Sequence, residues 1–164
     1  MKKQKTAIIG IGNKLMGDEG IGVHAIEHLR NSPSPPPLSH QGRGNNVKVD
    51  LVDGGTGGIA LLHILEKYEH AIIIDAADFG GEKGEICHFD IDSKQIILKP
   101  DSDQISLHSM SLAGIIKLAN QLDIKLPKIT IIAVQPEKIA PQMELSSSCK
   151  SSIMGIEKMI KEII

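Results

Sequence analysis

The sequence predicts an α/β fold: a three-layer α/β/α sandwich with a mostly parallel central sheet of about five strands, one of them antiparallel. Short, continuous apolar segments alternate along the chain with segments whose apolar residues recur at helical spacing. This alternation is typical of parallel strands that are joined by helices and buried on both faces. The length of 164 residues fits a single domain, residues 1–164.

The first two predicted elements are a strand and a helix, separated by a turn that contains glycine. Thr6–Ile11 is a short apolar segment that we predict as a buried strand. Asp18 is placed to cap the following helix, because aspartate oxygens accept hydrogen bonds from backbone N–H groups at helix starts. One face of this helix is apolar: Gly22, Ala25, Ile26 and Leu29.

The next segments repeat the pattern of a strand followed by an aspartate. Val47–Val52 is predicted as the second strand and is followed by Asp53 and a glycine-rich turn. His70–Ile74 is predicted as the third strand and is followed by Asp75. Between these strands lies a helix with this apolar face: Gly58, Leu61, Leu62 and Leu65.

The second half of the chain completes the order β-α-β-α-β-β-α-β-α. Glu85–Phe89 is a weaker strand, and Ile129–Val134 is a continuous apolar strand. Ser106 or Ser109 is placed to cap a helix between them. The apolar face of that helix is Leu112, Ile115, Ile116 and Ala119, and that of the last helix is Ile156, Met159, Ile160 and Ile163.

Residues 32–46 do not fit this compact pattern. They are rich in proline, glycine and serine and lie between a helix and a strand, where roughly 2–6 residues usually suffice. We predict that this segment is a disordered surface insertion.

Composition excludes several classes of function. The formal net charge is −2 and no basic cluster is present, so we expect no nucleic-acid partner. The apolar run Ala7–Ile9 is too short for a signal peptide, and no stretch reaches the ~18 apolar residues of a membrane span. Cys87 and Cys149 read as reduced thiols. We therefore expect a cytoplasmic protein that does not associate with membranes.

The first turn, residues 10–20, does not carry a phosphate-binding motif. Leu15 stands where the third glycine of a dinucleotide-binding turn is required, and no Gly-Lys-Ser/Thr sequence follows. The turn carries the acidic pair Asp18 and Glu19 instead. Acidic residues at a helix start can simply stabilise the helix, or one of them can reach the carboxyl edge of the sheet, where ligands of such sheets bind.

Three residues from separate turns form a candidate metal site. Glu19 and Asp75 supply carboxylate oxygens, and His108 supplies an imidazole nitrogen near a helix start, which favours the neutral, metal-binding ring. Two oxygens and one nitrogen suit a borderline divalent ion such as Ni²⁺ or Zn²⁺. A serine–histidine arrangement with Ser109 is the competing possibility, but no Gly-x-Ser-x-Gly elbow occurs.

The order of motifs resembles the [NiFe]-hydrogenase maturation endopeptidases. The chain opens with Gly10-Ile11-Gly12-Asn13, then Asp18-Glu19-Gly20-x-Gly22. The motifs that follow, in the order of that family, are Asp53-Gly54-Gly55-Thr56, Asp75-Ala76, Ser106-Leu107-His108, Gln135-Pro136-Glu137 and Leu145-Ser146. The resemblance spans nearly the whole chain, apart from the insertion and Glu144, where some members carry glycine.

The resemblance implies an endopeptidase that removes the C-terminal extension of a nickel-loaded [NiFe]-hydrogenase large-subunit precursor. It implies that Glu19, Asp75 and His108 bind nickel, which the substrate supplies, and zinc or cadmium could occupy the same site. Water activation is left open between the metal ion and a carboxylate, Asp53 or Asp75. Gly54, Gly55 and Thr56 are candidates for binding the extended peptide. We expect a monomer.

Two alternatives remain at this stage. The chain could be a related peptidase of the same fold that acts on another protein. It could also be a non-enzymatic module that binds a small ligand or a metal ion at the first turn.

Overall fold

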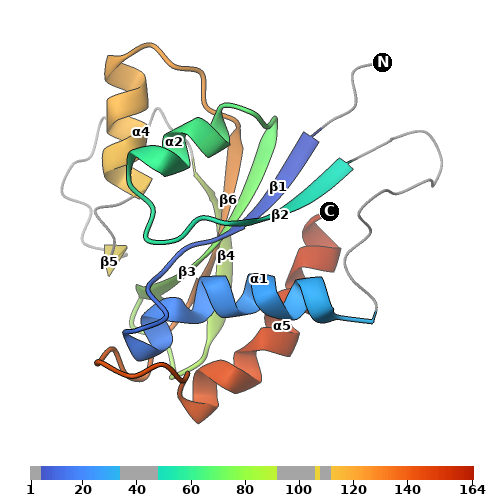
Figure 1. The fold of residues 1–164 in the computed structure, drawn as a ribbon, viewed down its shortest axis with the longest axis vertical. Coiled ribbons are helices and arrows are strands. Elements are labelled where there is room, and N and C mark those ends of the chain that lie inside the picture. Colours follow the sequence, from blue (N-terminus) through green and yellow to red (C-terminus); the bar gives the residue numbers. More distant parts are fainter. Residues whose placement is uncertain (1–4, 34–47, 92–105, 108–111) are drawn as a thin grey trace.

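The computed structural model describes residues 5–33, 48–91, 106–107 and 112–164, which form a central sheet with helices on both faces (Figure 1). The α/β fold class is as predicted. Two predictions concern residues outside the described ones: the insertion 32–46, from residue 34 onward, and the role of His108. Cys87 and Cys149 are free thiols, as expected.

The main sheet has the strand order β2-β1-β3-β6-β4. Its first four strands are parallel, whereas β4 runs antiparallel to β6. The strands are β1 (Lys5–Gly10), β2 (Lys48–Asp53), β3 (His70–Asp78), β4 (Ile86–Ile91) and β6 (Lys128–Val134). A short strand, β5 (Ser106–Leu107), pairs antiparallel with the end of β3.

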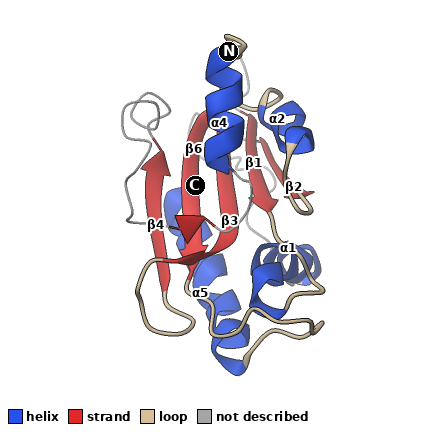
Figure 2. Ribbon diagram, turned by 90° about the vertical axis from the view of Figure 1, so that its left-hand side faces the viewer, coloured by secondary structure: helices blue, strands red, loops and turns tan. Residues whose placement is uncertain are grey.

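In the described part of the chain, two helices cover each face of the sheet, which gives the three predicted layers (Figure 2). Alternate strand residues supply the two cores: Ile9 and Ile73 face α2 and α4, whereas Ile8 and Ile72 face α1 and α5. The helical elements are the 3₁₀ turn η1 (Gly17–Gly20), α1 (Ile21–Asn31), α2 (Ile59–Leu65), α4 (Leu112–Gln121) and α5 (Ser147–Ile163).

The expected helix faces are confirmed, because nearly all of their apolar residues are buried. The strand β5 was not predicted. Ser106 lies in this strand and does not cap a helix, and α4 begins at Leu112. The third strand is also longer than expected, because β3 continues beyond Ile74 to Asp78 and keeps partners on β6 and β5. No helix in the described part of the chain is long and apolar enough to cross a membrane.

Candidate functional site

The glycines of the first turn allow close backbone packing at the carboxyl edge of the sheet. Gly12 has a φ of 137°, and a side chain there would collide with the backbone oxygen of Glu19. A side chain at Gly22 would collide with the backbone oxygen of Ile74, the residue before Asp75. Ile11 also donates its N–H to that oxygen at 3.0 Å. The first turn therefore packs directly against β3, next to the position of Asp75.

Asp18 has a different role from the predicted helix cap. It lies within η1, is fully buried, and does not cap α1, whose N-cap is Gly20. Its carboxylate accepts three backbone hydrogen bonds, from Glu137 at 2.9 Å, Lys138 at 2.8 Å and Ser146 at 2.7 Å. Burial alone would raise the pKa of Asp18, but these hydrogen bonds outweigh it and hold the pKa below its usual value.

Asp75 is a nearly fully buried carboxyl group inside β3. Its residue pairs with Ala133 of β6, and only 5% of it is exposed. Burial and, to a lesser extent, the charge of Glu19 together raise the pKa of Asp75 to about 7, against the opposing effect of a hydrogen bond from the backbone of Ala76. Asp75 therefore changes its charge near neutral pH, which is typical of groups at functional sites.

Glu19 is the second carboxylate of this site. It is half-buried in η1 and interacts electrostatically with Asp75. Among the described residues, no hydrogen bond or ion pair engages the side chain of Glu19, and no lysine or arginine pairs with Asp75. Two like charges without a positive partner are unfavourable, and a divalent cation between them would offset the repulsion. The pair is thus suited to hold a cation.

His108, the third predicted ligand, lies outside the described residues, so its position relative to this pair stays a prediction. The described residues alone contain no group of three potential ligands arranged for a metal ion. The neighbouring β5 runs towards the site: Ser106 pairs with Asp78, and Leu107 pairs with Ala77, two residues after Asp75.

Asp53 lies at the end of β2 and is exposed to solvent. One of its carboxylate oxygens accepts a hydrogen bond from the N–H of Gly55 at 2.8 Å. Carboxylates at the ends of neighbouring parallel strands approach each other, but Asp53 and Asp75 do not lie on neighbouring strands. The strand β1 lies between β2 and β3, with Gly10 paired to both Asp53 and Ile74, so two strand spacings, about 10 Å, separate the two strand ends.

The loop after β2 is open to solvent. Gly55, Gly57 and Gly58 have φ angles of 55°, 82° and 75°, and a Cβ added at any of them would meet no atom within 4 Å. Thr56 is exposed. This loop, which contains the predicted peptide-binding residues, leaves room for an extended chain to approach its backbone.

Gln135 is a polar residue at this edge whose role the pattern analysis missed. It is 8% exposed and follows β6 directly. Its side-chain oxygen accepts hydrogen bonds from the N–H groups of Phe79 and Gly81, at 3.0 and 3.1 Å, and its amide donates to Asp78. Gln135 therefore fixes the loop after β3. A glutamine immediately after a continuous apolar strand was the available signal.

Comparison with known proteins identifies the family. The sequence profile of the hydrogenase maturation protease family matches residues 23–163. The chain is 30% identical over 138 residues to the hydrogenase expression/formation protein HupD of Rhodobacter capsulatus, covering 84% of this chain and 60% of that protein. It is 32% identical to a putative hydrogenase maturation protease of Methanocaldococcus jannaschii, covering 71% of this chain and 68% of that protein. The chain thus spans about three fifths of the length of the HupD relatives it matches.

Solved structures agree with this assignment. The hydrogenase maturating endopeptidase HybD of Escherichia coli has a TM-score of 0.71 at 25% identity, over 96% of this chain and 90% of that chain. The [NiFe] hydrogenase maturation protease HybD of Thermococcus kodakarensis has a TM-score of 0.70 at 25% identity, over 98% and 99%. The chain belongs to the hydrogenase maturation protease family.

Proposed function

We propose that this chain is an endopeptidase that removes the C-terminal extension of a [NiFe]-hydrogenase large-subunit precursor after nickel insertion. Family membership supports a protease of hydrogenase maturation. The observation that carries the proposal is the pair of Asp75 and Glu19, a buried and a half-buried carboxylate without a positive partner among the described residues. Such a pair can distinguish a precursor that brings a divalent cation from one that does not.

Nickel is part of the substrate in this proposal, and Glu19, Asp75 and His108 recognise it. In the absence of a cation, burial and the charge of Glu19 favour the protonated form of Asp75 near neutral pH. An arriving cation favours loss of this proton, and the resulting carboxylate then contributes to binding. The direction of β5, which leads from Ala77 towards Asp75, supports His108 as the third ligand. Zinc or cadmium would satisfy the same donor atoms.

Cleavage requires a group that activates water, and we propose Asp53 for this role. It is solvent-exposed, and the hydrogen bond from Gly55 occupies only one of its oxygens, so the other can accept a proton from water. Gly54, Gly55 and Thr56 would hold the extended substrate segment beside it. The alternative route uses Asp75 or the nickel ion itself to activate the water.

A processing assay with two forms of the precursor tests this function. Nickel-loaded and nickel-free large subunit are incubated with the wild type or with Glu19→Gln, Asp75→Asn or His108→Ala, and loss of the C-terminal extension is measured by mass spectrometry. We expect the wild type to cleave only the nickel-loaded form and each variant to cleave it at least ~100-fold more slowly. Glu144→Gln is the control, because the Glu144 side chain is exposed and, within the described part of the chain, pairs only with Lys150.

Each contrary outcome identifies one of the alternatives. Equal cleavage of both precursor forms by the wild type and all three variants would eliminate nickel recognition. Cleavage of an unrelated protein, with both precursor forms left intact, would indicate a related peptidase with another substrate. Binding of Ni²⁺ without cleavage of any protein would indicate a non-enzymatic module.

A further inference from the structure

Asp18 is, among the residues that the structure describes, the most completely buried charged residue that the proposed chemistry does not use. None of it is exposed, and its two carboxylate oxygens accept three hydrogen bonds from backbone N–H groups. The donors, Glu137, Lys138 and Ser146, all lie in the segment between β6 and α5. They are more than one hundred residues away in sequence, so the carboxylate connects the start of the fold to its last helix.

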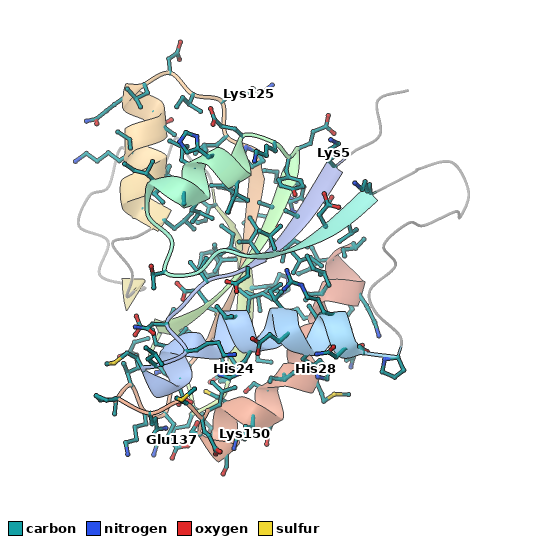
Figure 3. The ribbon with its side chains drawn as sticks, in the orientation of Figure 1. Lys5, His24, His28, Lys125, Glu137 and Lys150 are labelled. Carbon is teal, nitrogen blue, oxygen red and sulfur yellow. The ribbon has the colours of Figure 1, made fainter. Side chains whose placement is uncertain are left out.

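Backbone hydrogen bonds extend this connection along the first turn. Asp18 donates its own N–H to the oxygen of Lys138 at 3.1 Å, and Gly17 donates to Gln142 at 2.7 Å. Gln142 in turn donates to Leu15 at 3.1 Å. Figure 3 shows Glu137 at the end of the molecule where α1 begins. The first turn is therefore attached on one side to the segment 137–146.

Glu19 occupies the position between this attachment and the sheet. It follows Asp18 directly, and on its other side the backbone of Gly12 approaches it so closely that a side chain at Gly12 would collide with it. The Glu19 carboxylate makes no contact of its own with the segment 137–146 in the described hydrogen bonds. Its position beside Asp75 thus depends on how the backbone around it is held.

We propose that Asp18 is a positioning residue whose three hydrogen bonds fix the backbone of Glu19, so that the Glu19 carboxylate lies beside Asp75. Asp18 acts through Glu19 and does not touch the substrate. The placement of Glu19 stands on the structure alone, whereas its consequence for cleavage rests on the proposed function. A carboxylate suits this role because its two oxygens can accept several N–H groups at once, whereas an asparagine side chain offers one oxygen and presents its own N–H groups.

A double-mutant cycle measures whether Glu19 and Asp75 still interact when Asp18 is changed. Urea unfolding at pH 8 is measured for the wild type, Glu19→Gln, Asp75→Asn and the double variant, and the cycle is repeated with Asp18→Asn. We expect the two carboxylates to be coupled by about five-fold in the unfolding equilibrium constant. With Asp18→Asn, this coupling should fall below two-fold.

Glu157→Gln provides a matched control for the loss of a buried carboxylate. Glu157 is 7% exposed and accepts a hydrogen bond from Lys161 of the same helix at 2.7 Å. It connects α5 to α1 by accepting from His28 at 3.0 Å when the Nε2 atom of that ring carries a proton. His28 lies farther along α1 than His24, away from the first turn (Figure 3). This variant should lose stability as Asp18→Asn does and keep the five-fold coupling. A general loosening of the fold would lower the coupling in both backgrounds.

A milder pair of variants covers the case in which Asp18→Asn does not fold. Ser146 has a φ of −58°, which proline adopts without strain, and Ser146→Pro removes one backbone N–H from Asp18 together with the side-chain hydrogen bond of Ser146 to Asp18. Ser146→Ala keeps that N–H and, like the proline variant, loses the hydroxyl group that accepts from Cys149. We expect a smaller coupling between Glu19 and Asp75 in Ser146→Pro than in Ser146→Ala.

Unchanged coupling in Asp18→Asn, or in Ser146→Pro relative to Ser146→Ala, would overturn the role of Asp18. Absence of coupling in the wild type would overturn it as well, because Glu19 would then not lie beside Asp75. In the processing assay, Asp18→Asn as a single substitution should lower kcat/KM at least ten-fold. When it is added to a protein that already carries Glu19→Gln, it should have little further effect on kcat/KM. A wild type that shows the coupling and cleaves no precursor would refute the proposed function and leave the role of Asp18 standing.

Discussion

The turn after β2 and the carboxyl end of β3 carry the same sequence pattern, an apolar strand followed by an aspartate, and differ in structure. Asp53 is exposed, and its neighbour Gly55 has open space around it. Asp75 is 5% exposed, lies within its strand and interacts electrostatically with Glu19. The cause is the place of each strand in the sheet, since β2 is an edge strand and β3 is central.

This difference separates two chemical roles that the sequence pattern leaves equivalent. A carboxylate in contact with water is already charged near neutral pH and can accept a proton. A buried carboxyl group beside another acid has a raised pKa and loses its proton more readily when a cation arrives. The edge strand is therefore suited to water activation, and the central strand to recognition of a cation. The predictions below test this division, from the largest expected effect to the smallest.

The largest expected effect is on processing, where the two aspartates should alter different kinetic parameters. Asp53→Asn should lower kcat for the nickel-loaded precursor by at least ~100-fold with little change in KM, because general-base catalysis contributes 10²–10⁴-fold. Asp75→Asn should raise KM and reduce the preference for nickel-loaded over nickel-free precursor. Steady-state kinetics with both precursor forms measures these effects. A lower kcat in Asp75→Asn and a higher KM in Asp53→Asn would refute this division of roles.

The second prediction compares a glycine that packs against β3, Gly22, with a glycine in the open loop after β2, Gly57. Gly22→Ala should destabilise the protein by about 4 kcal/mol or more, because the added Cβ would collide with the backbone oxygens of Ile74 and Ile11. Gly57→Ala should cost only about 1 kcal/mol, from the strain of a φ of 82° in open space. Urea unfolding of both variants provides the test, and similar losses would show that the two turns are packed alike.

The third prediction is a pH-dependent stabilisation by Asp75→Asn. The pKa of Asp75 is raised from 3.8 to about 7 by burial and by Glu19, so ionising this group in the folded protein costs stability. The cost is absent below pH 4, grows as the pH rises towards 7, and is complete above it. At pH 8 the variant should be more stable than the wild type by about 4 kcal/mol, since each unit of pKa shift is equivalent to about 1.4 kcal/mol, and the two should converge near pH 4. An equal difference at both values would contradict this explanation.

The smallest expected effect is that of Asp53→Asn on stability. Among the described residues, the exposed carboxylate accepts one hydrogen bond, from the N–H of Gly55, so its loss should change the free energy of unfolding by no more than about 0.5 kcal/mol. Urea unfolding measures this change, and an effect as large as that of the third prediction would place Asp53 in a buried environment.

The fold was predictable because the apolar periodicity is strong. The helix residues Ala25, Ile26 and Leu29 and the strand residues Ile72 and Ile73 are buried where their spacing places them. The two-residue strand β5 was not predictable, since Ser106 and Leu107 carry no periodic signal and pair only through tertiary contact with β3.

The candidate site could be predicted only in part. The electrostatic interaction of Glu19 with Asp75 agrees with their predicted positions at the carboxyl edge of a parallel sheet. The role of Asp18 did not, because an acid at a helix start predicts a local cap, whereas its donors lie more than one hundred residues later. The separation of Asp53 from Asp75 depends on the strand order, since β1 lies between strands that follow each other in the chain.

Direct titration of the Asp75 carboxyl group is the sharpest test of the central claim. In the ¹³C-labelled wild type, its NMR resonance should titrate with a midpoint near pH 7, because the group is buried beside Glu19. In Glu19→Gln the midpoint should fall, because one cause of the raised pKa has been removed. A midpoint near 4 in the wild type, or no change in Glu19→Gln, would contradict a coupled acidic pair at the end of β3.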